Sequence, residues 1–422
     1  MGHLRIKLYD MMFALSCAMD LVAPELFNHH QQVAYLAYRL AEEMGLSKVE
    51  QQTLFMAGML HDIGSLSIKE RLGMLQQEQL ETNSHAFRGA ALLERYRPFA
   101  PLARIVRYHH IPWNHGEGEH YGGEAVPFAS HVLHLADRAC VLFNEKKNIL
   151  LQVPSMMEQL SNGSGTAFTP ASVKALAQLC QREYIWLELI DREPLHFVSK
   201  EASSHMGELD LDQVLEVSKL FSHAIDFRSR FTATHSASVA KAAQKLGELS
   251  GFSECECKML LVAGYLHDLG KMAIDASILE KPGQLDPREY RIIRCHTFYT
   301  HLLLSKIPGL ETINEWASYH HEKLTGNGYP YHLKGEELSY GSRIMAVADI
   351  FTALTEDRPY RKGMERDQVK AVLTGMVNNG AISEILVELL LSHYELFCGL
   401  REEGHAQALA EYEKILCYSE HP

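Results

Sequence analysis

The chain repeats itself, and this repeat limits what it can fold into. The segment MLHDIG at residues 59–64 recurs without a gap 206 residues later as YLHDLG. Each copy then carries two histidines 24 residues apart, His85 with His109 and His296 with His320. Two coincidences of this length indicate a duplicated structural unit. The 422 residues are therefore expected to form two related domains, each long enough to have its own core.

Apolar residues in the repeated unit recur at helical spacing. Residues 33–40 follow the i, i+3, i+4, i+7 pattern, and Gly45 and Gly251 stand where the two equivalent helices are expected to end. Alternating strand patterns are nearly absent. The expected fold class is therefore all-α, with two tandem helical domains. The expected domains span residues 1–203 and 207–422.

Composition and charge exclude several classes of protein. The net charge of −13 argues against a nucleic-acid polymer or an anionic membrane as partner. The eight cysteines show no CxxC spacing, which suits reduced thiols in the cytoplasm. The apolar run Met11–Pro24 is too short for a membrane span, and no export signal is visible. We therefore expect a cytoplasmic protein without a membrane anchor.

The second copy contains an ordered series of side chains that can bind metal ions. The series comprises five imidazoles and two carboxylates: His235, His267, Asp268, His296, His320, His321 and Asp349. Any one of these histidines alone could be an ordinary core or surface residue, but the whole set indicates metal binding. Imidazole with carboxylate suits iron, manganese, nickel or zinc rather than calcium or magnesium. We expect two divalent ions, with iron or manganese favoured over nickel or zinc.

Two such ions about 3.5–4 Å apart would clamp a phosphodiester and hold a bridging hydroxide that attacks phosphorus. The pair His267-Asp268 can bind one ion while the second oxygen of Asp268 bridges to the other. Lys271 follows four residues after His267, which places it on the same helical face if the helix continues. Lys271 is then a candidate ligand for a phosphate oxygen, and the alternative is a solvated lysine at a helix end.

Longer motifs in the second copy identify a family. HDLGK at 267–271 is followed by HHE at 320–322, GYP at 328–330, RIMAVAD at 343–349 and DRPYRK at 357–362. Together they resemble the HD-GYP family of phosphodiesterases over roughly Asp212 to Leu400. The resemblance implies an all-helical domain that hydrolyses a cyclic dinucleotide, either cyclic di-GMP or 3′,3′-cyclic GMP-AMP, to the linear dinucleotide.

The resemblance also implies roles for individual residues. The seven metal-binding candidates above become the metal ligands, with Asp268 and Lys271 catalytic. Substrate would be bound by the residues Lys271, Gly328, Tyr329, Pro330, Arg343, Arg358 and Arg361. Arginine suits phosphate because its guanidinium can donate two parallel hydrogen bonds.

Three departures from the family pattern affect the expected chemistry. Thr325 replaces an aspartate in the loop before Gly-Tyr-Pro, and Thr352 stands where an acidic residue is common. Neither is a metal ligand in the match, so they bear on substrate preference or loop position. Phe231 lies four residues before His235, where a member with a third metal would place a glutamate. We therefore predict two metals in this copy.

The first copy keeps a counterpart for every ligand. These residues are His29, His61, Asp62, His85, His109, His110 and Asp137, and they form a second candidate metal site. However, Ser65 stands at the lysine position, residues 113–123 contain no Gly-Tyr-Pro, and residues 142–147 replace the arginine-bearing run. We expect a degenerate HD domain that serves regulation or dimerisation. The alternative is a second hydrolytic site for a smaller phosphate, such as the linear product.

Three functions stay open for the whole chain. The first is a metal-dependent phosphodiesterase that opens a cyclic dinucleotide. The second is a non-catalytic scaffold that binds a cyclic dinucleotide, and the third is an HD-type phosphohydrolase of nucleotides. The Gly-Tyr-Pro loop and residues 357–362 argue against the third. A second copy of the chain or a signalling protein is the expected kind of protein partner.

Overall fold

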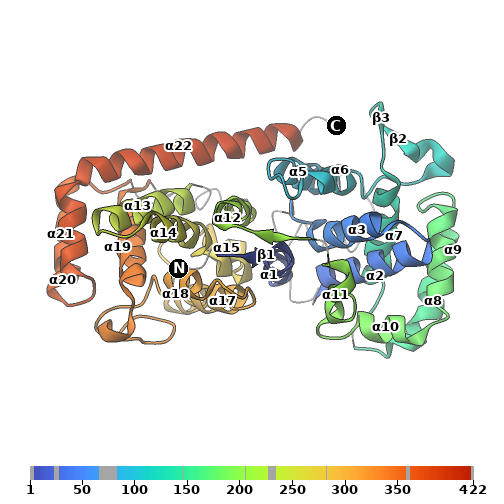
Figure 1. The fold of residues 1–422 in the computed structure, drawn as a ribbon, viewed down its shortest axis with the longest axis horizontal. Helices are drawn as coiled ribbons and strands as arrows, with labels where there is room; N and C mark the ends of the chain where they lie inside the picture. Colours follow the sequence, from blue (N-terminus) through green and yellow to red (C-terminus); the bar gives the residue numbers. More distant parts are fainter. Residues whose placement is uncertain are drawn as a thin grey trace. The chain divides into compact units, whose positions relative to one another are not determined.

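The computed structural model describes residues 4–22, 28–65, 83–144, 146–204, 206–226, 234–281, 283–357 and 362–419 (Figure 1). The chain divides into two compact units, one of residues 15–207 with 415–422 and one of residues 1–14 with 208–414. Both units are built almost wholly of helices, and the described strands are two residues long. The predicted all-α fold with two tandem helical domains is confirmed.

The unit of residues 15–207 is here called the N-terminal unit, and it begins within helix α1 (Leu8–Asp20). Its helices are α2 (His29–Glu43), α3 (Lys48–Leu60), α5 (Asn83–Leu93), α6 (Ala100–Arg107), α7 (Phe128–Val141), α8 (Ile149–Asn162), α9 (Pro170–Leu179), α10 (Glu183–Leu189) and α11 (Ser199–Ala202). Short 3-10 helices η3 (Asn114–Glu119) and η4 (Pro194–Phe197) and the hairpin β2 (His120–Tyr121) and β3 (Glu124–Ala125) complete it.

The other unit, here the C-terminal unit, contains the second copy. Its helices are α12 (Leu211–Asp226), α13 (His235–Leu249), α14 (Glu254–Leu266), α15 (Ala276–Leu279), α16 (Pro287–Ile293), α17 (Cys295–Leu304), α18 (Glu311–Ser318), α19 (Tyr340–Thr355), α20 (Arg366–Asn378), α21 (Glu384–Ser392) and α22 (Tyr394–Ser419). Two 3-10 helices are η5 (Leu269–Ala273) and η6 (Gly335–Glu337). The antiparallel pair β1 (Ile6–Lys7) and β4 (Glu208–Leu209) closes the unit.

The first residues of the chain belong to the C-terminal unit. Ile6 pairs with Leu209 across the β1–β4 ladder, and its side chain is fully buried. The Cδ1 atom of Ile6 also packs against Gly309, leaving no room for a side chain there. These contacts group residues 1–14 with residues 208–414, whereas the sequence led us to place them in the first domain. The boundaries 1–203 and 207–422 as functional domains stay a prediction.

The repeat is visible in the paired helices α2–α3 and α13–α14. Gly45 and Gly251 end the first helix of each pair with positive φ angles of 70° and 84°, as predicted from the sequence. The second helix of each pair begins with a capping box, made by Ser47 with Glu50 and by Ser253 with Glu256. Both copies therefore set the start of the helix that leads to the His-Asp pair in the same way.

A close contact of small residues joins the two helices of each pair. A Cβ atom at Gly264 would lie 2.3 Å from the Cα of Ala240, and one at Gly58 would lie 2.5 Å from the Cα of Ala34. The backbones therefore touch at these points, which only glycine permits. In the C-terminal unit this contact fixes the start of α13, where His235 lies, relative to the end of α14.

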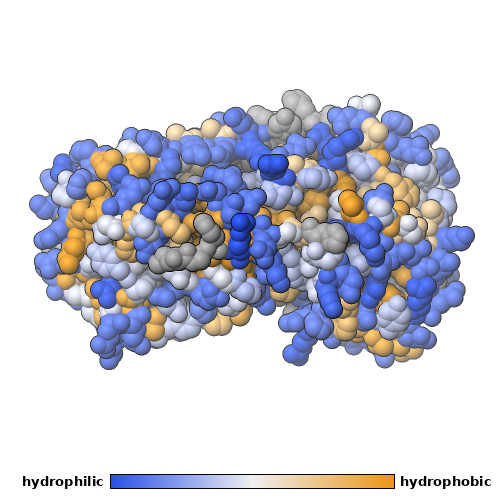
Figure 2. Space-filling view, viewed as in Figure 1, coloured by the Kyte–Doolittle hydropathy of each residue, from blue (hydrophilic) through white to orange (hydrophobic). Residues whose placement is uncertain are grey.

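The surface is mixed in character. On the face drawn in Figure 2, hydrophilic residues separate the apolar ones into small patches. Among the described residues, no helix is both long enough and apolar enough to cross a membrane. The seven cysteines whose side chains the structure describes carry free thiols, in keeping with the absence of paired spacings in the sequence.

We expect Gly264→Ala to lower the free energy of unfolding by about 1–3 kcal/mol, because its new methyl group would overlap the backbone of α13. Gly375→Ala is the matched control. Gly375 lies inside α20 with nothing within 4 Å of an added Cβ, so alanine should stabilise the helix by about 0.5–1 kcal/mol. Urea unfolding of both variants measures the difference, and equal midpoints would contradict the close-contact argument.

Candidate metal centres

The C-terminal unit brings all seven predicted ligands together at the ends of helices. His235 begins α13, His267 and Asp268 follow α14, His296 lies in α17, His320 and His321 follow α18, and Asp349 lies in α19. Ligand atoms of His235, His267 and Asp268 lie within 4.8 Å of one another, and so do those of His296, His320 and His321. The site thus consists of two neighbouring groups, each able to hold one ion.

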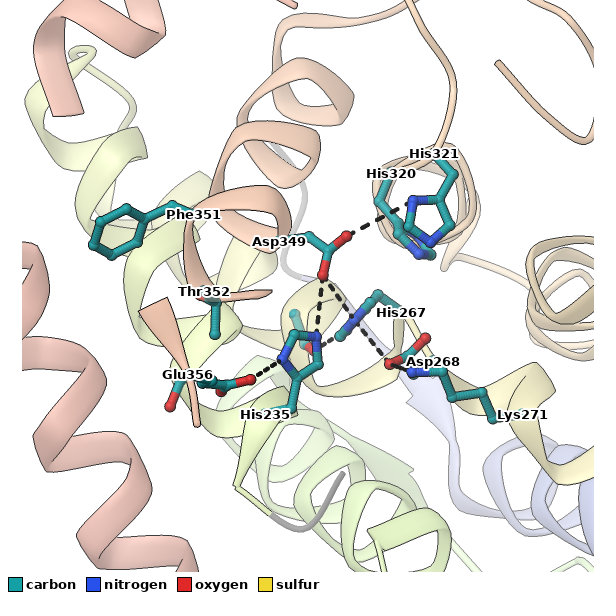
Figure 3. A network of polar contacts seen from close by, with 12 residues as sticks. His235, His267, Asp268, Lys271, His320, His321, Asp349, Phe351, Thr352 and Glu356 are labelled. Atoms are coloured by element: carbon teal, nitrogen blue, oxygen red, sulfur yellow. Dashed lines mark hydrogen bonds and ion pairs between the residues drawn. The ribbon is translucent and has the colours of Figure 1, made fainter. Parts of the chain in front are cut away.

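Two carboxylates connect the groups. Asp268 has Oδ2 3.2 Å from His267 Nε2 and Oδ1 3.4 Å from His296 Nε2, so its two oxygens face different groups. Asp349 lies between His235 and His321, with distances of 3.0 Å and 3.7 Å to their ring nitrogens (Figure 3). A carboxylate that faces two histidine groups is suited to bridging two cations, as predicted for Asp268.

Backbone carbonyls orient the imidazole rings of the ligands. Nδ1 of His267 lies 2.7 Å from the carbonyl oxygen of Gly264, and His296 and His320 make the equivalent contact with the residue three positions earlier at 2.6 Å. Each Nδ1–H therefore donates to the backbone, and each Nε2 turns toward the cluster. Among the described residues, the buried Nε2 of His267 has no hydrogen-bond partner.

The donor set fits a divalent transition metal. Burial lowers the pKa of His296 to about 3, which keeps its imidazole neutral. Burial opposes ionisation of Asp268, but the charges of His267 and Lys271 hold its pKa well below the usual value. The neutral imidazole of His296 and the ionised carboxylate of Asp268 are in the protonation states that metal ligands require. A buried nitrogen without a hydrogen-bond partner is the atom that an ion would satisfy.

Lys271 reaches the site by a different route from the one predicted. The sequence places Lys271 on the helical face of His267 only if α14 continues, but α14 ends at Leu266 and η5 follows. Residues three apart lie one above the other in a 3-10 turn, which brings Lys271 against Asp268. Its Nζ is 2.5 Å from Asp268 Oδ2. The lysine therefore contacts the bridging carboxylate, and its side chain stays partly exposed.

The predicted Gly-Tyr-Pro loop lies beside the ligands. The ring of Tyr329 is 4.9 Å from the ring of His321, and the guanidinium of Arg294 stacks 4.6 Å from the centre of the Tyr329 ring. A Cβ atom at Gly328 would lie 2.4 Å from the Cα of Glu322, so glycine is required there. Tyr329 thus contacts both the guanidinium of Arg294 and the ring of the metal-ligand candidate His321.

Glu322 holds the chain that follows this loop. Its carboxylate is buried and accepts hydrogen bonds from the backbone N–H groups of Tyr331, His332 and Leu333, at 2.7, 3.1 and 3.1 Å. Three charge-assisted bonds to one carboxylate fix the path of the backbone. Because Glu322 directly follows His321, the loop and the ligands share one anchor.

The predicted arginines have different outcomes. Arg343 donates to the carbonyl oxygens of Leu338, at 3.0 Å, and Gly335, which assigns its guanidinium to the backbone before α19. A substrate contact by Arg343 stays a prediction. Arg358 and Arg361 lie outside the described residues, as does Phe231.

The N-terminal unit assembles its own complete set. Asp62, His85, His109 and His110 form one group, and His29, His61 and Asp137 form the other, with ligand atoms within 4.8 Å in each. Asp62 has Oδ2 3.6 Å from His61 and Oδ1 3.2 Å from His85, which reproduces the bridging arrangement of Asp268. Within the part of the chain that the structure describes, the buried Nε2 atoms of His61 and His109 have no hydrogen-bond partner.

Sequence reasoning missed three residues of the C-terminal site. Glu356 accepts from Nδ1 of His235 at 2.8 Å, Glu322 anchors the loop, and Arg294 stacks on Tyr329. The spacing of seven residues between Asp349 and Glu356 was the available signal, because residues seven apart share a helix face. Nothing in the sequence around Arg294 distinguished it from other surface arginines.

The fold and the two ligand sets define a tandem HD-domain protein. Sequence profiles described as "HD domain" match residues 26–142 and 219–382. A 3′3′-cGAMP-specific phosphodiesterase 1 of Vibrio cholerae is 30% identical over 407 residues, which cover 93% of each chain. A cyclic di-GMP phosphodiesterase of Thermotoga maritima is 34% identical over 40% of this chain and 46% of its own.

The fold is also found in a solved structure. The crystal structure of a cyclic GMP-AMP specific phosphodiesterase of V. cholerae superposes with a TM-score of 0.66 at 24% identity, over 93% of this chain and 98% of that one. The likeness extends through both units. The chain belongs to the HD-GYP family of phosphodiesterases.

We predict that each unit binds metal through its own His-Asp pair. The double variant His267→Ala with Asp268→Ala should lose the metal of the C-terminal unit and keep that of the N-terminal unit, and His61→Ala with Asp62→Ala should do the reverse. Inductively coupled plasma mass spectrometry of manganese-loaded, desalted full-length protein measures the content. If either double variant retained as much manganese as the wild type, the ligand assignment would be contradicted.

Proposed function

We propose that the chain is a metal-dependent phosphodiesterase that hydrolyses 3′,3′-cyclic GMP-AMP to the linear dinucleotide in the cytoplasm. The observation that carries the choice of substrate is the extent of the match to relatives. The V. cholerae relative named as cGAMP-specific matches 93% of this chain, through both HD domains, whereas the T. maritima cyclic di-GMP relative matches 40%. Cyclic di-GMP is therefore the second candidate.

The catalytic centre is proposed to be the one in the C-terminal unit. His235, His267 and Asp349 would hold one ion, His296, His320 and His321 the other, and Asp268 would bridge them. Two ions, with iron or manganese favoured, would lower the pKa of bound water toward about 7 and neutralise charge on the phosphate. The donor set described above supports this assignment, because it combines imidazoles with carboxylates, which divalent transition metals bind.

Cations around this centre are suited to a substrate with two phosphates. Lys271 lies against Asp268 and can donate to a phosphate oxygen beside the bridging carboxylate. Arg294 adds a second positive charge at the outer side of Tyr329. We propose that Lys271 meets the phosphate to be cleaved and that Arg358 and Arg361 meet the other. Gly328, Tyr329 and Pro330 would then form the wall of the substrate site.

The alternatives fit the site less well. A scaffold without turnover has no need of a complete double ligand set with a lysine on the bridging carboxylate. An HD-type nucleotide phosphohydrolase does not account for the loop that Glu322 and Gly328 hold against the ligands. A homodimer or a signalling partner stays a prediction for the protein as a whole.

Product analysis by chromatography tests the proposal. We expect the manganese- or iron-loaded protein to convert 3′,3′-cyclic GMP-AMP to linear dinucleotide faster than it converts cyclic di-GMP. The variant with His267→Ala and Asp268→Ala should lose turnover by at least about 10³-fold, because bound metal supplies the nucleophile. Intact substrates in the presence of metal-loaded wild-type protein would overturn the phosphodiesterase proposal, and faster cleavage of cyclic di-GMP would reverse the choice of substrate.

Lys271→Ala isolates the contribution of the lysine. We expect a loss in kcat of about 10²-fold, the typical effect of removing one group that stabilises transition-state charge. Lys245→Ala is the control, because Lys245 pairs with Glu248 at the far end of α13. Metal content is measured in parallel. A Lys271→Ala enzyme with full metal and unchanged kcat would remove the lysine from the mechanism.

The complete ligand set favours a metal-bound N-terminal unit. Its seven candidates converge as closely as those of the catalytic unit, although Ser65 replaces the lysine. We propose that this unit holds metal, with regulation or dimerisation as its role. If it instead hydrolyses a smaller phosphate, the chromatogram of wild-type protein will contain a product beyond the linear dinucleotide. That product will disappear when His61 and Asp62 are replaced by alanine.

A further inference from the structure

His235 differs from other histidines of the catalytic centre in its place on its helix. The Nδ1 atoms of His267, His296 and His320 each donate to the backbone carbonyl oxygen three residues earlier. His235 is the first residue of α13, and its Nδ1 contacts a side chain instead. Carbonyl oxygens in a helix point toward its C-terminal end, so those of α13 point away from a ring at its first residue. Its Nδ1 needs a partner from another element.

Glu356 supplies that partner from the end of α19. Its Oε2 lies 2.8 Å from His235 Nδ1, while Asp349 Oδ1 lies 3.0 Å from His235 Nε2 on the other side of the ring. Figure 3 shows the imidazole held between the two carboxylates. The side chains of His235 and Glu356 are only 6% and 10% exposed, so water screens the contact little.

We propose that Glu356 is a positioning residue for the metal ligand His235. When Nδ1–H donates to Glu356, the tautomer is fixed, and the lone pair of Nε2 faces Asp349 and the metal centre. The carboxylate also makes the imidazole a stronger electron donor to a cation. This inference deepens the proposed function and rests on its assignment of His235 as a metal ligand.

The proposal accounts for a departure seen in the sequence. Thr352 stands on α19 between Asp349 and Glu356, where an acidic residue was expected. Thr352 is fully buried, and within the described part of the chain its Oγ1 has no hydrogen-bond partner. A side chain at Thr352 and one at Glu356 lie on the same side of α19 as the His235 ring (Figure 3). Glu356 thus provides a negative charge on this side of α19, one helical turn beyond Thr352.

The N-terminal unit offers an internal comparison. Asp137 corresponds to Asp349, and its Oδ1 lies 3.1 Å from His29 Nε2, as in the catalytic unit. Seven residues after Asp137 stands Asn144, which carries no charge. Its side-chain oxygen accepts from the backbone N–H of Lys146 instead. At this spacing from the shared position of the aspartate in the repeat, only the unit that we propose to be catalytic carries a carboxylate.

The test compares metal retention in full-length protein. Wild type, Glu356→Ala, Glu356→Gln and the double variant Thr352→Asp with Glu356→Ala are loaded with manganese and titrated with a chelator. Glu403→Ala is the control, since Glu403 is an exposed carboxylate of the same unit on α22. Differences from wild type report on the C-terminal centre, because the N-terminal centre is identical in every protein.

We expect Glu356→Ala to weaken manganese binding by about 10–100-fold, the usual effect of losing a residue that orients a ligand. Glu356→Gln should lose less, because the amide oxygen still accepts from Nδ1–H. Adding Thr352→Asp to Glu356→Ala should restore most of the affinity, which a purely structural role for Glu356 would not predict. Glu403→Ala should retain metal like wild type.

Two results would overturn the proposal. One is wild-type retention of manganese by Glu356→Ala, and the other is equal loss in Glu356→Ala and the double variant despite unchanged circular dichroism. If Glu356→Ala fails to fold, the comparison of Glu356→Gln with wild type decides, and equal retention counts against the proposal. None of these measurements uses a substrate. A wild-type protein that binds metal but cleaves no dinucleotide would therefore defeat the proposed function and leave this test intact.

Discussion

The arrangement of the site in the C-terminal unit depends on the contacts that the carboxylate of Asp268 makes. It faces His267 with one oxygen, His296 with the other, and Lys271 lies against it. These partners come from three separate elements, so the carboxylate is effective only if the helices meet at fixed positions. The contact of Gly264 with Ala240 sets one of those positions, because it allows no adjustable side chain between α13 and α14.

The same arrangement around Asp62 shows what the duplication kept and what it changed. Both units retain the bridging aspartate, the glycine contact between the paired helices and the two histidine groups. The differences lie around this framework, at Ser65 in place of Lys271 and at Asn144 in place of Glu356. The framework that gathers the ligands is thus separable from the groups that we propose to meet a substrate or tune a ligand.

Much of this could be predicted from the sequence. The repeat, the helical fold and the helix ends at Gly45 and Gly251 follow from spacing and from glycine's access to positive φ. The two groups of metal-ligand candidates were also found, because residue type and order restrict them strongly. Lys271 was placed correctly beside the site but for the wrong reason, since the helix ends before it.

The missed features depend on contacts between distant parts of the chain. Glu356 meets His235 across 121 residues, and Ile6 meets Leu209 across 203. No local pattern reveals either pairing. Arg343 lies inside a recognisable motif, but its hydrogen bonds to backbone carbonyl oxygens also depend on the fold, and its contact with substrate stays a prediction.

The way in which Glu322 holds the loop has a consequence for how the site can diversify. Its three hydrogen bonds go to backbone N–H groups, which every residue except proline provides. The path of the backbone at residues 331–333 is therefore independent of most side chains along it, including that of Tyr331. Mutation can change the surface that we propose to face the substrate while the ligands next to Glu322 stay in place. In such a loop, selectivity among cyclic dinucleotides can change by mutation while the residues for their hydrolysis are kept.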